Sequence, residues 1–210
     1  MAQNVYSLNV VGYINIPLVE GFNLIANQLD FDGTGTNNGT ANILGTNLPQ
    51  NSVVYTWSGG NFEIASFVKL KGQTAPAWTA NYSLNPGQGA WLSIPAGAFG
   101  GATQLLTTVG TVDTGALVNP NMASAGGFSL LGSMVPIAGG LQSVLNYTPM
   151  LNDSVYQYIN GGYVISTYAK LKGANTPTWN PNGEPQIAIG QGFWLNSSAG
   201  SVWSNYFIVQ

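Results

Sequence analysis

The sequence lacks cysteine, histidine and arginine, and it is poor in charge of either sign. Without cysteine the 210-residue chain has no disulfide, no thiolate nucleophile and no zinc–thiolate site. Without histidine it lacks the usual general base and the commonest transition-metal ligand. Four lysines against seven acidic residues give a net charge of −3, which excludes a surface that neutralises many phosphates. These absences argue against an enzyme and against a nucleic-acid partner.

Long apolar runs are also missing. None reaches the roughly 18 residues of a transmembrane helix, so the sequence predicts no transmembrane segment. The start, Met1–Asn4, has neither the basic nor the apolar region of a signal peptide, whereas Ala2-Gln3 matches what remains after many small-residue cleavage sites. We expect a mature secreted protein, extracellular or at the bacterial cell surface. A cytoplasmic protein without a leader is the alternative.

What the chain does contain is an internal repeat. Lys69–Gly72 recurs unchanged as Lys170–Gly173, and Gly87–Leu92 recurs with one substitution as Gly190–Leu195. This order predicts two copies of one unit of about 100 residues, residues 1–112 and 113–210. Four further matches follow the same order: Gly21–Ile25 with Gly127–Leu131, Tyr55–Trp57 with Tyr156–Tyr158, Gly59–Phe62 with Gly161–Tyr163, and Pro76–Trp78 with Pro177–Trp179.

The local patterns are those of β-structure. Val53–Trp57 alternates apolar and polar side chains and then meets Ser58–Asn61, whose glycines suit a tight hairpin turn. Clusters of glycine, proline and asparagine punctuate the whole chain, as in a sandwich or barrel. Only Ala41–Leu44 and Leu141–Leu145 could form a helical turn. We predict an all-β fold of two tandem antiparallel units, related by a pseudo-two-fold, with few or no helices.

The cations follow the repeat. Lys69 and Lys71 lie in the first Lys-Leu-Lys-Gly segment, and Lys170 and Lys172 lie in the second. In a strand, the two lysines of each segment would point to one face. They could dock an acidic group on a ligand or a neighbouring subunit, or they could block edge-to-edge pairing of strands. The acidic residues follow no repeat, so no duplicated acid-dependent active site is visible.

Tryptophans also pair across the copies, Trp78 with Trp179 and Trp91 with Trp194. We interpret these pairs as aromatic fillers of the core of each unit, with a sugar-stacking platform as the alternative. Trp203 has no aromatic partner in the other copy, which makes it a candidate for a surface contact.

One segment has the spacing of a calcium loop. In Asp30–Gly39, the side chains of Asp30, Asp32 and Asn37 could supply the oxygen ligands that Ca²⁺ prefers. The bidentate glutamate of calcium loops is missing, because Ala41 holds that position, and the second copy has no acid there. A polar loop without a metal is the alternative, and no other cofactor is expected.

Three segments together resemble a known group of proteins: Asn4–Tyr13, Gly21–Asn27 and Leu84–Leu92. The chain is similar to secreted, glycine- and aromatic-rich β-repeat proteins of unknown function from Verrucomicrobia-type bacteria. The resemblance implies export after a signal peptide that ends just before Gln3. It implies no reaction and supplies no catalytic residues.

The leading functional hypothesis is a non-enzymatic structural protein that self-assembles into a filament, tube or surface layer. So few charges leave little electrostatic barrier to association, and apolar terminal strands invite pairing with another copy of the chain. The expected assembly residues lie in the first and last strands: Tyr6, Leu8, Val10, Ile14, Trp203 and Phe207.

The alternative is a carbohydrate-binding or adhesion module, with glycans as partners. Such a module needs exposed aromatic side chains flanked by polar ones, and Tyr82, Trp203 and Tyr206 are the candidates. An ice- or surface-binding protein ranks below both, because no regular Thr-x-Thr array is present.

Overall fold

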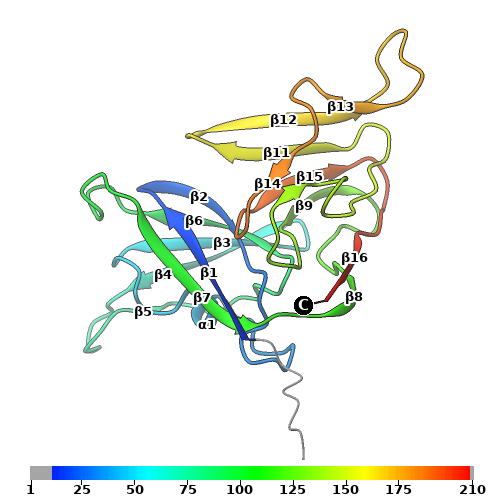
Figure 1. Ribbon diagram of the computed structural model, residues 1–210. Helices are drawn as coiled ribbons and strands as arrows, with labels where there is room; N and C mark the ends of the chain where they lie inside the picture. The colour runs from blue at the N-terminus through cyan, green and yellow to red at the C-terminus, as the bar shows by residue number, and fades with distance from the viewer. Residues whose placement is uncertain (1–10, 209–210) are drawn as a thin grey trace, which may run out of the picture.

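A computed structural model describes residues 11–208, and within them the chain is almost entirely β-strand, with one short helix (Figure 1). The all-β prediction is confirmed. Tyr6, Leu8 and Val10 lie outside the described residues. The elements of the first half are β1 (Val11–Leu18), β2 (Gly21–Ala26), α1 (Thr40–Leu44), β3 (Ser52–Ser58), β4 (Asn61–Val68), β5 (Ala77–Trp78), β6 (Gly89–Ile94) and β7 (Gln104–Thr111).

The second half repeats this series of strands. Its elements are β8 (Gly115–Val118), β9 (Gly127–Leu131), β10 (Gly139–Gly140), β11 (Ser154–Ile159), β12 (Gly162–Ala169), β13 (Thr178–Asn180), β14 (Gln186–Ile187), β15 (Phe193–Ser197) and β16 (Ser204–Phe207). Residues 141–145, the counterpart of α1, form turns.

The two halves have the same topology. Each contains a five-stranded antiparallel sheet, in the order β2-β6-β3-β4-β5 in the first half and β9-β15-β11-β12-β13 in the second. Each half also pairs its first strand with its last, β1 with β7 and β8 with β16, in a two-stranded ribbon. The prediction of two similar β units is confirmed, and the boundary at residues 112 and 113 stays a prediction.

The hairpins at the centre of each sheet follow directly from their glycines. Ser58 pairs with Asn61, so β3 and β4 are joined by the two residues Gly59 and Gly60, which have φ angles of 56° and 84°. A two-residue turn with positive φ at both positions matches the twist of the strands, and glycine adopts it without strain. The second copy uses residues 160 and 161 in the same way.

Each half has its own hydrophobic core beneath its sheet. The first core contains Leu18, Phe67 and Leu92, and Trp78 packs against it. The second contains residues such as Leu131 and Phe193, together with Trp179. The interpretation of Trp78 and Trp179 as core aromatics is therefore confirmed.

Trp91 and Trp194 occupy a different place. Together with Leu24 and Leu130, they form a third cluster to which both halves contribute equally. The expectation that this pair fills the core of each separate unit was wrong, because their strand positions point to the opposite face of each sheet, toward the other half. The third cluster joins the two units.

The Gly-Gln-Gly motifs form the backbone of this junction. The amide of Ala26 donates to the carbonyl of Gly190 over 2.8 Å, and the amide of Gly132 donates to the carbonyl of Gly87 over 3.0 Å. Each motif thus binds the edge strand of the other half, in equivalent positions. Such reciprocal contact is the signature of a two-fold relation rather than a simple translation.

The last glycine of each motif is required by close approach. A Cβ atom on Gly89 would lie 2.8 Å from the carbonyl oxygen of Leu131, and a Cβ on Gly192 would collide with the carbonyl oxygen of Ile25. Backbone atoms of a paired strand cannot move aside without breaking the sheet. Only glycine therefore allows the two halves to meet at this distance.

Gly192→Ala should destabilise the protein by roughly 1–3 kcal/mol, the usual range for overpacking, and Gly89→Ala should do so to a smaller extent. Gly162→Ala is the matched control, because its Cβ would meet nothing within 4 Å and its φ is not positive. Urea unfolding of the three variants measures the difference. Equal midpoints for Gly192→Ala and Gly162→Ala would contradict the assigned junction.

Candidate functional site

Three of the predicted assembly residues are placed by the structure, and none offers an exposed surface for docking. Ile14 is buried in the first core. Trp203 is only 3% exposed, and its indole Nε1 donates to the carbonyl of Leu145 over 2.6 Å. Phe207 is half-buried and packs against the first core. The expectation of a surface contact at Trp203 was wrong, because its side chain fills the second core. The side chains of Ile14 and Phe207 turn toward the first core, and their part in assembly through the terminal strands stays a prediction.

The opposite face of the first ribbon is the exposed one. Tyr13 of β1 pairs with Val109 of β7, and their side chains are 72% and 53% exposed. Val11 lies beyond Tyr13 on the same face, and Leu105 lies beyond the exposed polar pair of Asn15 and Thr107. Both Val11 and Leu105 are more than half exposed. No charged residue occurs in either strand.

The second ribbon, β8–β16, presents an equivalent face. Tyr206 is 67% exposed, and Val118 and Ile208 are exposed beside it. Neither strand carries a charge. The molecule therefore has two topologically equivalent, uncharged ribbon faces, which we call the first and second ribbon faces.

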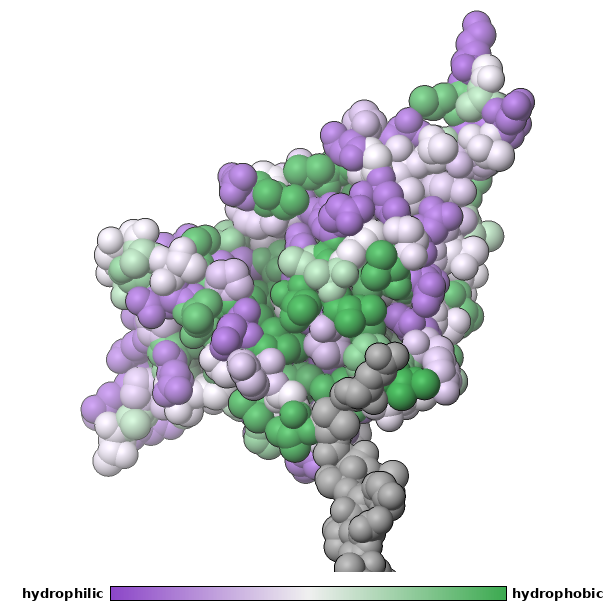
Figure 2. Space-filling view, viewed as in Figure 1, coloured by the Kyte–Doolittle hydropathy of each residue, from purple (hydrophilic) through white to green (hydrophobic). Residues whose placement is uncertain are grey.

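The Lys-Leu-Lys segments do not lie in strands. They follow the ends of β4 and β12, and each turns at a glycine of positive φ, Gly72 at 90° and Gly173 at 86°. All four lysines are exposed. The two segments belong to loops that project at opposite ends of the molecule (Figure 1), where Figure 2 shows hydrophilic residues at both tips. The expectation of lysines aligned on one strand face is corrected.

The proposed calcium loop is held by its own hydrogen bonds. Asp30 accepts from the amide of Gly35 over 2.7 Å, and Asp32 accepts from the amide and hydroxyl of Thr34 and from the side chain of Asn37. These bonds hold the pKa of Asp32 below its ordinary value, with Asn37 as the largest cause. Among residues 11–208, no group of three acidic, histidine or cysteine side chains is arranged to hold a metal. Calcium binding stays a prediction.

Other carboxylates also cap backbone turns. Glu20 accepts from the amides of Gly97 and Phe99, which lowers its pKa, and Glu184 accepts from the amides of Gln142 and Ser143. The few acids of the chain are thus used largely to satisfy loop donors.

Asp113 is different. Burial raises its pKa, and the nearby charge of Asp30 raises it further. The two residues line a small pocket of about 270 Å³. Their approach could not be read from the sequence, because they lie 83 positions apart in segments without a shared motif.

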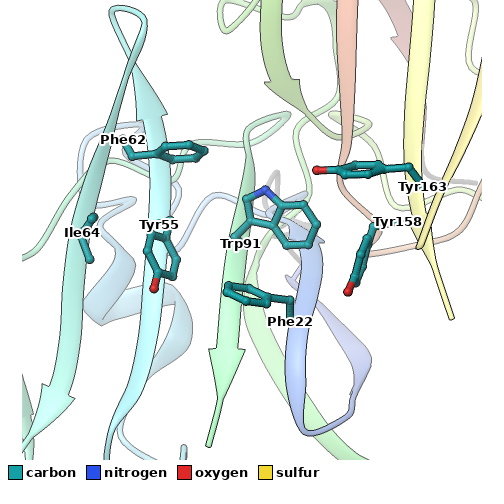
Figure 3. A pocket seen from close by; sticks show the side chains of 7 residues that line it. All are labelled: Phe22, Tyr55, Phe62, Ile64, Trp91, Tyr158 and Tyr163. Atoms are coloured by element: carbon teal, nitrogen blue, oxygen red, sulfur yellow. The ribbon is translucent and has the colours of Figure 1, made fainter. Parts of the chain in front are cut away.

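An aromatic surface lies between the two halves. A pocket of about 430 Å³ is lined by Phe22 of β2, Trp91 of β6, Tyr55 of β3 and two residues of β4, all from the first sheet, and by aromatic residues of β11 and β12 from the second. Figure 3 shows these side chains projecting from neighbouring strands toward the other half. The complete lining is Phe22, Tyr55, Phe62, Ile64, Trp91, Tyr158 and Tyr163.

A second pocket, of about 460 Å³, is its counterpart. Its lining follows from the first by exchange of the two copies, with Trp194 in place of Trp91 and Tyr156 in place of Tyr55. Phe62, Trp91 and Tyr163 line both pockets, so the two form one continuous aromatic cleft. The complete lining is Trp57, Phe62, Trp91, Phe128, Tyr156, Tyr163, Ile165 and Trp194.

The rings of the cleft support one another edge to face. Trp91 meets Tyr158 of the other half at 4.8 Å between ring centroids, and Trp57 meets Trp194 at 5.1 Å. The indole of Trp57 also donates to the carbonyl of Phe128 over 3.3 Å. These contacts cross between the copies, so the cleft depends on the junction. Phe62 and Tyr163 remain 46% and 52% exposed.

The alternation along β3 indicates that its aromatic residues share one side of the strand, but it does not indicate that this side faces the other half. Val54 and Thr56 of β3 are buried, whereas Tyr55 and Trp57, between and beyond them, face the other half. Apolar residues on one face of a strand normally indicate the core of its own unit.

Of the residues predicted to contact glycans, Tyr82 is half-buried against the first core and only Tyr206 is exposed.

Comparisons with family models, with curated proteins and with solved structures found no match to this chain. In the described part of the chain, no helix has the length and apolar character needed to cross a membrane.

Asp113→Asn should raise the melting temperature at pH 7 by about 1–2 °C, a small effect because the group is half-exposed. The pKa of Asp113 is higher in the folded protein than in the unfolded chain. The folded state therefore loses stability as pH rises from the ordinary pKa of aspartate through the raised pKa. At neutral pH the charged carboxylate of Asp113 destabilises the fold. The gain should vanish at about pH 3, where both states of the wild type are protonated.

Asp32→Asn is the control of opposite sign. Its lowered pKa means that the charged form stabilises the fold above the ordinary pKa of aspartate, and this contribution is lost as pH falls. Thermal scans at pH 7 should show a lower melting temperature. The same sign for both variants would contradict the assigned electrostatics.

Proposed function

We propose that the protein is a non-enzymatic extracellular structural protein that assembles head to tail through its two ribbon faces. The observation that carries the proposal is the pair of equivalent, exposed and uncharged faces centred on Tyr13 and Tyr206. Large exposed apolar side chains gathered on one face of a soluble protein mark a site of interaction. The partner is another copy of the same chain.

Charge supports association at these faces. The four lysines lie on the projecting loops, away from both ribbons, and the net charge is only −3. Because the ribbon strands carry no charge, two copies meet little electrostatic repulsion where these faces come together. Figure 2 shows hydrophobic residues between the hydrophilic tips on the viewed side.

The arrangement of the faces favours an open-ended polymer. The first ribbon face of one copy docks on the second ribbon face of the next, which leaves one face of each kind free at the two ends. Such heterologous contacts give filaments whenever the rotation between subunits does not close a ring. In this mechanism both ribbons keep their hydrogen bonds within each chain. Neighbouring copies pack face to face and do not pair their terminal strands with one another.

The test is to place a charge on each face. Tyr13→Glu and Tyr206→Glu should each abolish large particles in light scattering at micromolar concentration, because a buried, unpaired carboxylate opposes the contact. Thr74→Glu, on an exposed loop away from both ribbons, changes the net charge equally and should assemble as the wild type does. A wild-type protein that remains monomeric would refute the proposal.

Mixing the two variants separates head-to-tail from like-to-like contact. Tyr13→Glu retains only the second ribbon face and Tyr206→Glu only the first, so an equimolar mixture should form dimers while each variant alone stays monomeric. Analytical ultracentrifugation distinguishes these species. Dimers formed by one variant alone would show that a face pairs with its own kind.

A further inference from the structure

We propose that the aromatic cleft between the two halves binds a neutral saccharide. The cleft uses no residue of β1, β7, β8 or β16, so this site is separate from the ribbon faces. Its two pockets of about 430 and 460 Å³ lie within the roughly 300–1,000 Å³ range of small-molecule sites.

The lining selects against charged ligands. None of the residues that line either pocket is charged, and the lysines are on the distant loops. A charged ligand would lose its hydration in the cleft without gaining an opposite charge. The lining therefore favours a neutral molecule.

The polar atoms of the cleft select against a purely aliphatic ligand. Figure 3 shows the Tyr163 hydroxyl and the Trp91 indole nitrogen pointing into the space between the halves. The Tyr163 hydroxyl is protonated at neutral pH and can donate, and burial raises its pKa further. An aliphatic ligand would cover these groups without bonding them.

A sugar ring satisfies both requirements. One face of a pyranose presents C–H groups that pack against an aromatic ring, and its edge carries hydroxyls that both donate and accept. Tyrosine and tryptophan combine an apolar body with one polar atom, which matches this surface at little cost in side-chain entropy. Because the two pockets share Phe62, Trp91 and Tyr163, an oligosaccharide of several rings can occupy both at once.

The experiment is a glycan array of neutral oligosaccharides, followed by calorimetric titration with the best binder. Phe62→Ala and Tyr163→Ala remove exposed rings that both pockets share, and each should weaken binding by about tenfold. Leu70→Ala, which truncates an apolar side chain 54% exposed on a projecting loop outside the cleft and both ribbons, should leave the affinity unchanged. Circular dichroism of each variant verifies that it folds.

A matched pair tests the two-pocket arrangement. Tyr55→Ala alters only the first pocket and Tyr156→Ala only the second. Each should therefore weaken the binding of an oligosaccharide that spans the cleft less than Tyr163→Ala does.

Titrations with choline and with phenol test whether the cleft binds a cation or a simple aromatic molecule instead. The proposal is overturned if no neutral oligosaccharide binds, if Phe62→Ala and Tyr163→Ala bind normally, or if only choline or phenol binds. Because the assembly variants leave the cleft intact, failure of this site would not affect the assembly proposal.

Discussion

The close approach of each Gly-Gln-Gly motif to the edge strand of the other half is the contact on which the rest of the structure depends. Gly89 and Gly192 have no room for a side chain. Close to them, the amides of Ala26 and Gly132 donate hydrogen bonds to the motif of the other half, which neither half could make alone. An edge strand with unpaired amides is a liability in water. Here each copy covers the exposed edge of its twin, so the duplication becomes one body rather than two linked domains.

This junction also explains why aromatic residues gather where they do. Once the two sheets are held edge to edge, the faces that carry Trp91 and Trp194 meet and form a shared cluster. The rings farther from the junction are only partly covered, which leaves the cleft. The ribbons lie outside this arrangement and present their apolar faces outward. Each ribbon strand thus turns one face to a core and the other outward.

The repeat, the β character and the central hairpins could be predicted from the sequence, because they rest on ordered matches and on glycine turns. The sequence does not predict which face of each strand meets its own core and which meets the other unit. Alternation shows that Tyr55 and Trp57 share a side, but it cannot say whether that side meets the unit's own core or the other unit. The same ambiguity affected Ile14, where the buried stripe is the one that sequence reasoning assigned to assembly. Trp203 lacks a partner in the other copy and yet is buried, since a residue can be unique to one repeat and still fill its core.

Hydrogen exchange at the junction tests the central claim most directly. The amides of Ala26 and Gly132 each donate across the halves, and they bond to equivalent carbonyls. If the junction holds the molecule together, both amides should exchange only through global unfolding, at the same free energy as the amides in the middle of β3 and β11. Rapid exchange of these two amides, with the strand amides still protected, would show that the halves separate freely and would contradict this account.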